Sequence, residues 1–178
     1  MWTSGIKHIP HGIFKNSYNL EHMNIRNNKL EEIHESVLSH LKKLKALLIG
    51  SNRIKSISPS LFNKDGILEN EDLHFRPQVT VYLMDNKIKY FDPYEYDSNQ
   101  PAPKIILNNN PYRCSCSFRS FIQKYSRGRL TNLNIDEARC AEPTDLKGKR
   151  LTELSEISLG NCSSKDTDTG QCISTKST

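Results

Sequence analysis

Asparagine recurs at regular intervals along this chain, at Asn28, Asn52, Asn86 and Asn110. Two of the spacings are 24 residues, and the one between Asn52 and Asn86 is 34. Apolar residues precede each asparagine by five and three positions, as Met23 and Ile25 precede Asn28, and others follow the first three, as Leu30 and Ile33 do. A unit of about 24 residues cannot bury its own apolar face, so such units must stack. The spacing therefore predicts a repeat protein.

The alternating apolar stretch before each asparagine predicts one strand of a continuous parallel sheet. An asparagine amide both donates and accepts hydrogen bonds, so it can satisfy backbone groups where the strand bends away. A partial first copy places Ser4 in the asparagine position, 24 residues before Asn28, with Ile6 and Ile9 after it. Amphipathic helices would not place asparagine at a constant phase of the pattern, so we do not expect a helical repeat.

The segments 20–33 and 44–57 both follow the pattern L-x-x-L-x-L-x-x-N-x-L-x-x-I, with Met, Ile and other apolar residues at the leucine positions. This pattern resembles that of the extracellular leucine-rich repeat family. The resemblance implies an α/β repeat solenoid: a segment of a horseshoe with a curved parallel sheet.

We expect three regions. Residues 1–109 hold the repeats, with an insertion at 63–78. Asp65-Gly66 is a turn signal and Pro77 resists strand pairing, so we expect this insertion to be a loop on the descending or convex side. Residues 110–162 form a cysteine-rich C-terminal cap that closes the open end of the core. Residues 163–178 are rich in serine and threonine and are predicted to be a disordered tail or linker.

Four of the five cysteines lie in the expected cap, and their order, Cys114, Cys116, Cys140 and Cys162, resembles the C-terminal flank of extracellular leucine-rich repeat proteins. The resemblance implies two disulfides, Cys114–Cys140 and Cys116–Cys162, whereas the sequence alone allows other pairings. A four-cysteine zinc site is the alternative, but Cys-x-Cys lacks the usual two-residue loop. We therefore expect no metal and no cofactor. Cys172 is left over for another chain, an absent domain or a free thiol.

A helix is expected between the second and third cysteines. Ser117 is placed to cap its start and Gly128 to end it, and its apolar residues at helical spacing are Phe118, Phe121, Ile122 and Tyr125. This helix should cover the last repeat.

The residues that alternate with the buried ones on each strand should face the inner, concave side of the sheet. Three columns result, and the candidate ligand-binding residues in them are His22, Asn24, Arg26, Leu48, Tyr82, Met84, Lys104, Ile106 and Asn108. The middle column is mostly apolar, so with Met84 it predicts a contiguous exposed patch with a polar rim. Such a patch fits a protein ligand. The alternatives are that the inserted loop or a second copy, as in a homodimer, covers it.

Neither composition nor motifs favour an enzyme. No His-Glu-x-x-His, Gly-x-Ser-x-Gly or phosphate-binding glycine run is present, so no catalytic residue is expected. The net charge of +5 favours acidic partners. An acidic glycan is the alternative ligand, and the cap residues that would bind it are Arg113, Arg119, Lys124, Arg127, Arg129, Lys147, Lys149 and Arg150. Nucleic acid is not expected, because the cap aromatics fall at core spacing.

The cysteines favour an oxidising, extracellular compartment, for either a secreted protein or the ectodomain of a receptor or adhesion protein. An intracellular scaffold with free thiols is the remaining alternative. The first residues form no signal peptide and the chain starts in mid-repeat, so we expect a fragment of a longer protein. No apolar run approaches the length of a membrane span. Asn161 begins a glycosylation sequon whose middle residue, Cys162, is an expected disulfide partner.

Overall fold

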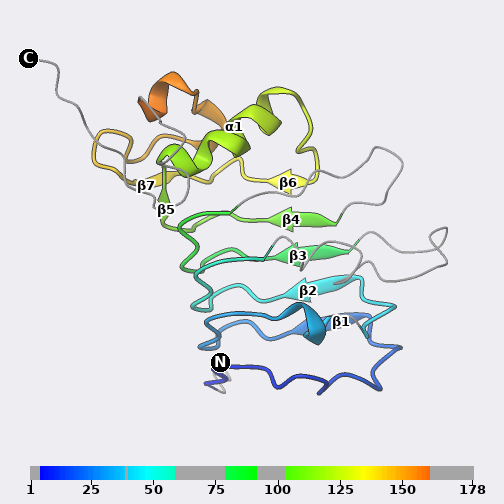
Figure 1. Cartoon of the computed structure of the whole chain (residues 1–178). Helices are drawn as coiled ribbons and strands as arrows, with labels where there is room; N and C mark the ends of the chain where they lie inside the picture. Colours follow the sequence, from blue (N-terminus) through cyan, green and yellow to red (C-terminus); the bar gives the residue numbers. More distant parts are fainter. Residues whose placement is uncertain (1–4, 39, 59–78, 92–102, 161–178) are drawn as a thin grey trace, which may run out of the picture.

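A computed structural model of the chain describes residues 5–38, 40–58, 79–91 and 103–160, and shows a solenoid whose coils stack from the N-terminal end upward (Figure 1). Each coil contributes one short strand to a parallel sheet with the order β1-β2-β3-β4-β6. The strands are β1 (His22–Asn24), β2 (Ala46–Leu48), β3 (Thr80–Tyr82), β4 (Lys104–Ile106) and β6 (Leu133–Asn134). The predicted leucine-rich repeat solenoid with a parallel sheet is confirmed.

The central residue of each strand points into the core. Met23, Leu47, Val81 and Ile105 stand in register from β1 to β4, and each is at most 6% exposed. The longer spacing between Asn52 and Asn86 leaves this register unchanged, because the strands on either side of it still pair residue for residue. The apolar pattern of the sequence therefore sets which face of the sheet is buried.

Several predicted features lie outside the described residues. They are Ser4, the insertion at 63–78, Asn161, Cys162, Cys172 and the tail at 163–178. Among the described residues, none of the helices has the length and apolar content that crossing a bilayer requires.

The repeated asparagines form a ladder of amides inside the coil. Asn52 Nδ2 donates to the carbonyls of Ile49 and Gly50 in its own coil and of Ile25 in the preceding coil, while its Oδ1 accepts from the Leu30 amide. Asn86 and Asn110 repeat this set of bonds one and two coils further on, and all three side chains are at most 6% exposed. Each amide thus joins two neighbouring coils.

The residue before each asparagine has a left-handed backbone. The φ angles are 58°, 56°, 58° and 57° at Asn27, Ser51, Asp85 and Asn109. Asparagine and aspartate tolerate this conformation better than other residues with a side chain, which explains three of the four positions. Ser51 is the exception.

We expect Ser51→Asn to raise the free energy of unfolding by about 1 kcal/mol, because asparagine reduces the cost of the left-handed backbone. The backbone bond from the Ser51 amide to the Met84 carbonyl, 3.0 Å long, is kept. Urea denaturation would measure the change. The reciprocal variant Asn27→Ser, at the equivalent position of the first coil, should lower the stability, and a loss on Ser51→Asn would contradict the explanation.

The cap begins with a second, two-stranded sheet of β5 (Tyr112–Arg113) and β7 (Cys140–Glu142). The Cys114–Cys140 disulfide ties these segments together across 26 residues of sequence, with the Cα atoms 5.6 Å apart. In the chain-entropy model a loop of this length stabilises the fold by about 3 kcal/mol. The bond also removes both sulfurs from any zinc site. Cys116 is disulfide-bonded too.

The cap helix differs in part from its prediction. A 3-10 turn, Cys116–Phe118, comes first, and the α-helix α1 spans Arg119–Ser126 with Phe118 as its N-cap, so Ser117 does not cap it. The Ser117 hydroxyl bonds instead to that of Ser115, 2.9 Å away. Gly128 ends the helix, as expected, with a left-handed backbone at φ 67°. The Gly128 amide bonds to the Tyr125 carbonyl, and the Arg129 amide bonds to the Lys124 carbonyl. This pair of bonds is the Schellman arrangement.

The cap also supplies the fifth strand, β6, which the sequence analysis missed. Leu133 pairs with Ile105, and the Leu107 amide bonds to the Asn134 carbonyl at 3.1 Å. The available signal was the segment Leu130-x-x-Leu133-x-Ile135, which repeats the apolar spacing of the earlier strands without a following asparagine. The strand edge of the last repeat is therefore paired rather than open.

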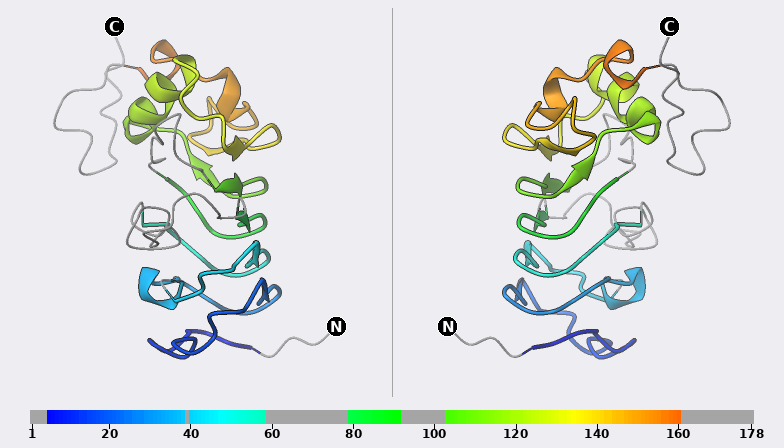
Figure 2. Two further views of the ribbon diagram at one scale, coloured as in Figure 1. Left: turned by 90° about the vertical axis from the view of Figure 1, so that its right-hand side faces the viewer. Right: turned by 90° about the vertical axis from the view of Figure 1, so that its left-hand side faces the viewer.

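Aromatic residues fill the junction between the last repeat and the cap. Phe118 is fully buried and packs edge to face on Tyr90, Phe91, Tyr112 and Phe121, with ring centroids 5.5 to 6.0 Å apart. Tyr125, expected to join this core, is 38% exposed and stacks on Phe121. Figure 2 shows α1 lying across the end of the last coil. The aromatic cluster thus attaches the cap to the repeats.

Candidate ligand-binding face

The candidate residues gather on the face of the parallel sheet that is opposite the buried core residues. Along one edge His22, Ala46, Thr80 and Lys104 are in register. The middle column runs through Asn24, Leu48, Tyr82 and Ile106, and β6 extends it to Asn134. The third column, just past the strand ends, holds Arg26, Gly50, Met84 and Asn108. Asn134 is the residue of this face that sequence reasoning missed, because β6 was not predicted.

The apolar part of this face is less exposed than expected. Leu48, Tyr82, Met84 and Ile106 are each partly covered, not fully exposed. The reason is the strand spacing of about 4.8 Å, at which side chains of one column cover each other's flanks. What remains accessible is a continuous but shallow apolar strip across β2, β3 and β4.

A glycine lets two side chains meet on the third column. Any Cβ at Gly50 would lie 3.1 Å from the Met84 carbonyl oxygen and 3.2 Å from Met84 Cγ. Without it, the Arg26 guanidinium reaches over Gly50 to within 3.9 Å of the Met84 sulfur. The charge of Arg26 is thereby held beside the apolar strip.

The polar rim is basic and amide in character. His22, Asn24 and Lys104 are exposed at the edges, and Asn108 Nδ2 donates to Asn134 Oδ1 at 3.1 Å at the cap end. The residues that the coils of β1 to β4 contribute to the three columns include no aspartate or glutamate, whereas in the coil of β6 the exposed Asp136 follows Asn134 at the offset of the third column.

In the coils of β1 to β4, two acidic residues are next to column residues in sequence. Glu21 is bound to Lys45 at 2.7 Å, and this bond, with the positive charge of Lys45, lowers the pKa of its carboxyl. Asp85 accepts a hydrogen bond from Asn109 at 3.1 Å. The face therefore suits a partner that is apolar at its centre and acidic at its border.

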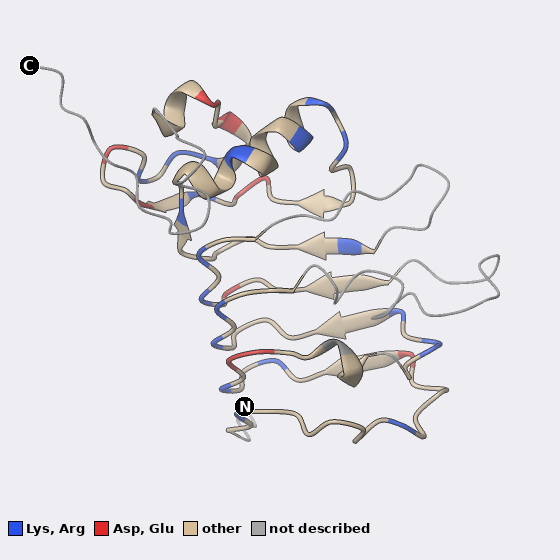
Figure 3. Cartoon of the chain, in the orientation of Figure 1, with Lys and Arg blue, Asp and Glu red and all other residues tan. Residues whose placement is uncertain are grey.

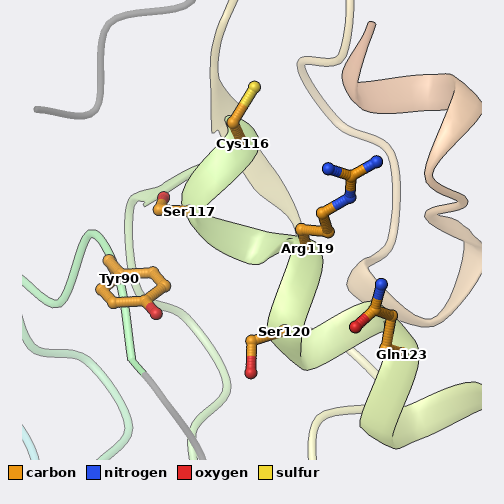
Figure 4. A pocket seen from close by; sticks show the side chains of 6 residues that line it. All are labelled: Tyr90, Cys116, Ser117, Arg119, Ser120 and Gln123. Atoms are coloured by element: carbon orange, nitrogen blue, oxygen red, sulfur yellow. The ribbon is translucent and has the colours of Figure 1, made fainter. Parts of the chain in front are cut away.

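A separate depression of about 260 Å³ lies where α1 meets the last repeat (Figure 4). Arg119 and Gln123 on its wall both bind Glu156, at 3.0 and 3.1 Å, and Cys116 is disulfide-bonded. Its arginine and glutamine are thus bound within the cap. No group of three metal-ligating side chains occurs in the described part of the chain. We therefore place the candidate site on the sheet.

Comparison with known proteins shows what this chain is similar to. The Leucine rich repeat family model matches residues 2–54. Toll-like receptor 10 of Bos taurus is 27% identical over 144 residues, which cover 79% of this chain and 16% of the relative. The chain thus spans less than a fifth of that protein's length.

Two solved structures share the fold. One, human trophoblast glycoprotein, has a TM-score of 0.60 at 21% identity, covering 79% of this chain and 46% of the other. The other, the Toll–Spatzle complex of Drosophila, has a TM-score of 0.62 at 24% identity, covering 85% of this chain and 19% of the other. The chain therefore has the leucine-rich repeat fold, its first repeats match the leucine-rich repeat family model, and its last repeat is closed by a disulfide-bonded cap.

Proposed function

We propose that this chain is an extracellular, non-enzymatic recognition module that binds a protein ligand on the concave face of its sheet. The observation that carries the proposal is the half-covered apolar strip of Leu48, Tyr82 and Ile106, with Met84 and Arg26 beside it and no carboxylate in the columns of β1 to β4. Tyrosine and arginine at the centre of an interface carry a large share of binding energy. The solved Toll–Spatzle complex supports the choice of a protein partner, since a protein of this fold is found there with one. The Cys114–Cys140 disulfide supports the extracellular location.

Photo-crosslinking would identify the ligand and locate it in one experiment. The probe is the full chain with p-benzoylphenylalanine in place of Tyr82, incubated with secreted proteins and irradiated. The matched control carries the same group in place of Tyr18, which is 48% exposed in the first coil. We expect a crosslinked protein at the first position and not at the second. The same crosslinks at both would contradict a concave site.

We expect Leu48→Asp and Tyr82→Ala each to weaken binding of that ligand about thirtyfold, as truncating a central contact residue does. Both side chains are only partly buried, so the melting temperature should change little. Titration calorimetry with the crosslinked ligand would measure the affinity, and Tyr18→Ala is the matched control. Unchanged affinity in both variants would move the site off the concave face.

A homodimer is the alternative occupant of the strip. Sedimentation across a wide concentration range distinguishes the two, because a dimer held by this face would dissociate in the Leu48→Asp variant. A wild-type chain that stays monomeric throughout would exclude the second copy as the partner.

A further inference from the structure

Basic residues recur at two positions after the strands, on a different side of the coil from the concave face, and only Glu31 and Pro111 interrupt them after β1 to β4. These positions lie one and three residues beyond the asparagine. The residue between them is buried, so the side chains on either side of it face the solvent. We name the set the basic ladder, and its members are Lys7, Lys29, Arg53, Lys55, Lys87, Lys89 and Arg113. Figure 3 shows lysine and arginine returning along the left-hand edge, where the chain turns after each strand.

Backbone hydrogen bonds place the members of the ladder one above another. The amide of Lys29 bonds to the Ile6 carbonyl at 2.8 Å, that of Arg53 to Leu30 at 2.8 Å and that of Lys87 to Ile54 at 2.9 Å. The Arg113 amide bonds in the same way to the Lys89 carbonyl at 2.9 Å. Successive coils therefore run side by side here, and neighbouring rungs are about 4.8 Å apart. The result is a row of cations that runs from coil to coil along the solenoid.

Few carboxylates neutralise the ladder. Lys55 binds Glu31 at 2.6 Å, whereas Lys89 and Arg113 share Glu142 at the longer distances of 3.6 and 3.8 Å. Asp85 lies beside the row and accepts a hydrogen bond from Asn109. Lys29, Arg53 and Lys87 are exposed, and the described residues place no carboxylate within ion-pair distance of them.

The ladder also changes the titration of its own acid. The hydrogen bond from Lys55 and the charges of Lys55, Arg53 and Lys7 lower the pKa of the Glu31 carboxyl. An anion next to this row is therefore stabilised by several coils at once.

The cap, which the sequence favoured as the basic surface, holds some of its cations in ion pairs. Arg119 binds Glu156 at 3.0 Å, and Arg150 shares Glu137 with Arg139 at 3.5 and 3.2 Å. Lys149 donates to the neutral Ser158 hydroxyl at 3.1 Å and keeps its charge. Positive charge is thus present on both surfaces, but on the ladder it recurs from coil to coil.

We propose that the basic ladder binds a linear sulfated glycan, laid along the solenoid axis across successive coils. A row of point charges matches a chain that carries anionic groups at regular intervals. Neither ladder position contains an aromatic residue, so the surface lacks the stacking platform that single-stranded nucleic acids use. Extracellular space, where disulfides persist, is also where sulfated glycans occur.

The test compares two triple variants of the full chain that remove the same charge. The ladder variant is Lys29→Ala, Arg53→Ala and Lys87→Ala, and the control is Lys43→Ala, Arg127→Ala and Lys147→Ala, three exposed cations elsewhere. The probe is a heparin oligosaccharide, with its desulfated form and a single-stranded DNA oligonucleotide as further ligands. Thermal melts establish that both variants fold.

At an ionic strength of about 0.15 M, the ladder variant should bind heparin about a hundredfold more weakly, and the control nearly as the wild type does. The slope of log affinity against log salt should fall by about 2 in the ladder variant alone. An equal loss in both variants, no wild-type binding, or equal affinity for desulfated heparin or DNA would each overturn the proposal.

Discussion

Replacing Asn86 by alanine is expected to lower the free energy of unfolding by about 3 kcal/mol, the penalty for leaving buried polar groups unsatisfied. Asn86 is 2% exposed, and its Oδ1 accepts from the Ile54 amide at 3.1 Å. Without it that amide has lost its acceptor inside the core, and the carbonyls of Ile49 and Leu83 each lose a donor. Urea denaturation followed by circular dichroism would measure the change.

Asn28→Ala is the matched control, because Asn28 has the equivalent place in the first coil. It accepts from the Ile6 amide at 3.0 Å and donates to Ile25 and Arg26, but its side chain is only partly buried. Water can replace these bonds, so we expect a loss of about 1 kcal/mol. Equal losses at the two positions would show that burial does not set the value of the amide.

The second large effect is expected from Phe118→Ala, which should lower the free energy of unfolding by about 4 kcal/mol, as cavity-forming substitutions of buried phenylalanine do. The ring is fully buried and lies edge to face against four other aromatic rings. Its loss leaves a cavity where the aromatic cluster joins the cap to the last repeat. Tyr125→Ala, which removes a ring that is 38% exposed in the same cluster, should lower it by about 1 kcal/mol.

Hydrogen exchange would show where the Phe118→Ala variant loosens. Each coil of a solenoid contacts only its neighbours and is stabilised by them, so the loss of protection from exchange should be greatest next to the cap. The Leu107 amide, bonded to the Asn134 carbonyl of β6, should exchange faster, while the Ile25 amide, bonded to the Leu48 carbonyl of β2, should change little. Uniform acceleration along the whole chain would instead indicate a single cooperative unit.

The asparagines could be predicted from the pattern within one coil, whereas the left-handed residues next to them could not. The amide ladder follows from one asparagine per coil at a constant offset, and the structure uses each in the same way. The residue before each asparagine has a left-handed backbone in every coil. The sequence did not predict this, because the residues at that position, Asn, Ser, Asp and Asn, do not form an apolar pattern. A turn preference is a weaker signal than a hydrophobic period.

The repeat, its buried residues and the place of the cap could be predicted because each depends on a pattern within one coil, and the same pattern returns in the next. Other features depend on how separate segments meet in space. Leu133 forms part of a strand because it pairs with Ile105 at the edge of the last repeat. Phe118 rather than Ser117 is the N-cap of α1, and its ring packs in the aromatic cluster. Contacts between coils also half-cover Leu48 and Tyr82, and they align Lys29, Arg53 and Lys87 into one row. Periodicity within a coil specifies what is buried, whereas the contacts of one coil with the next specify what a ligand meets.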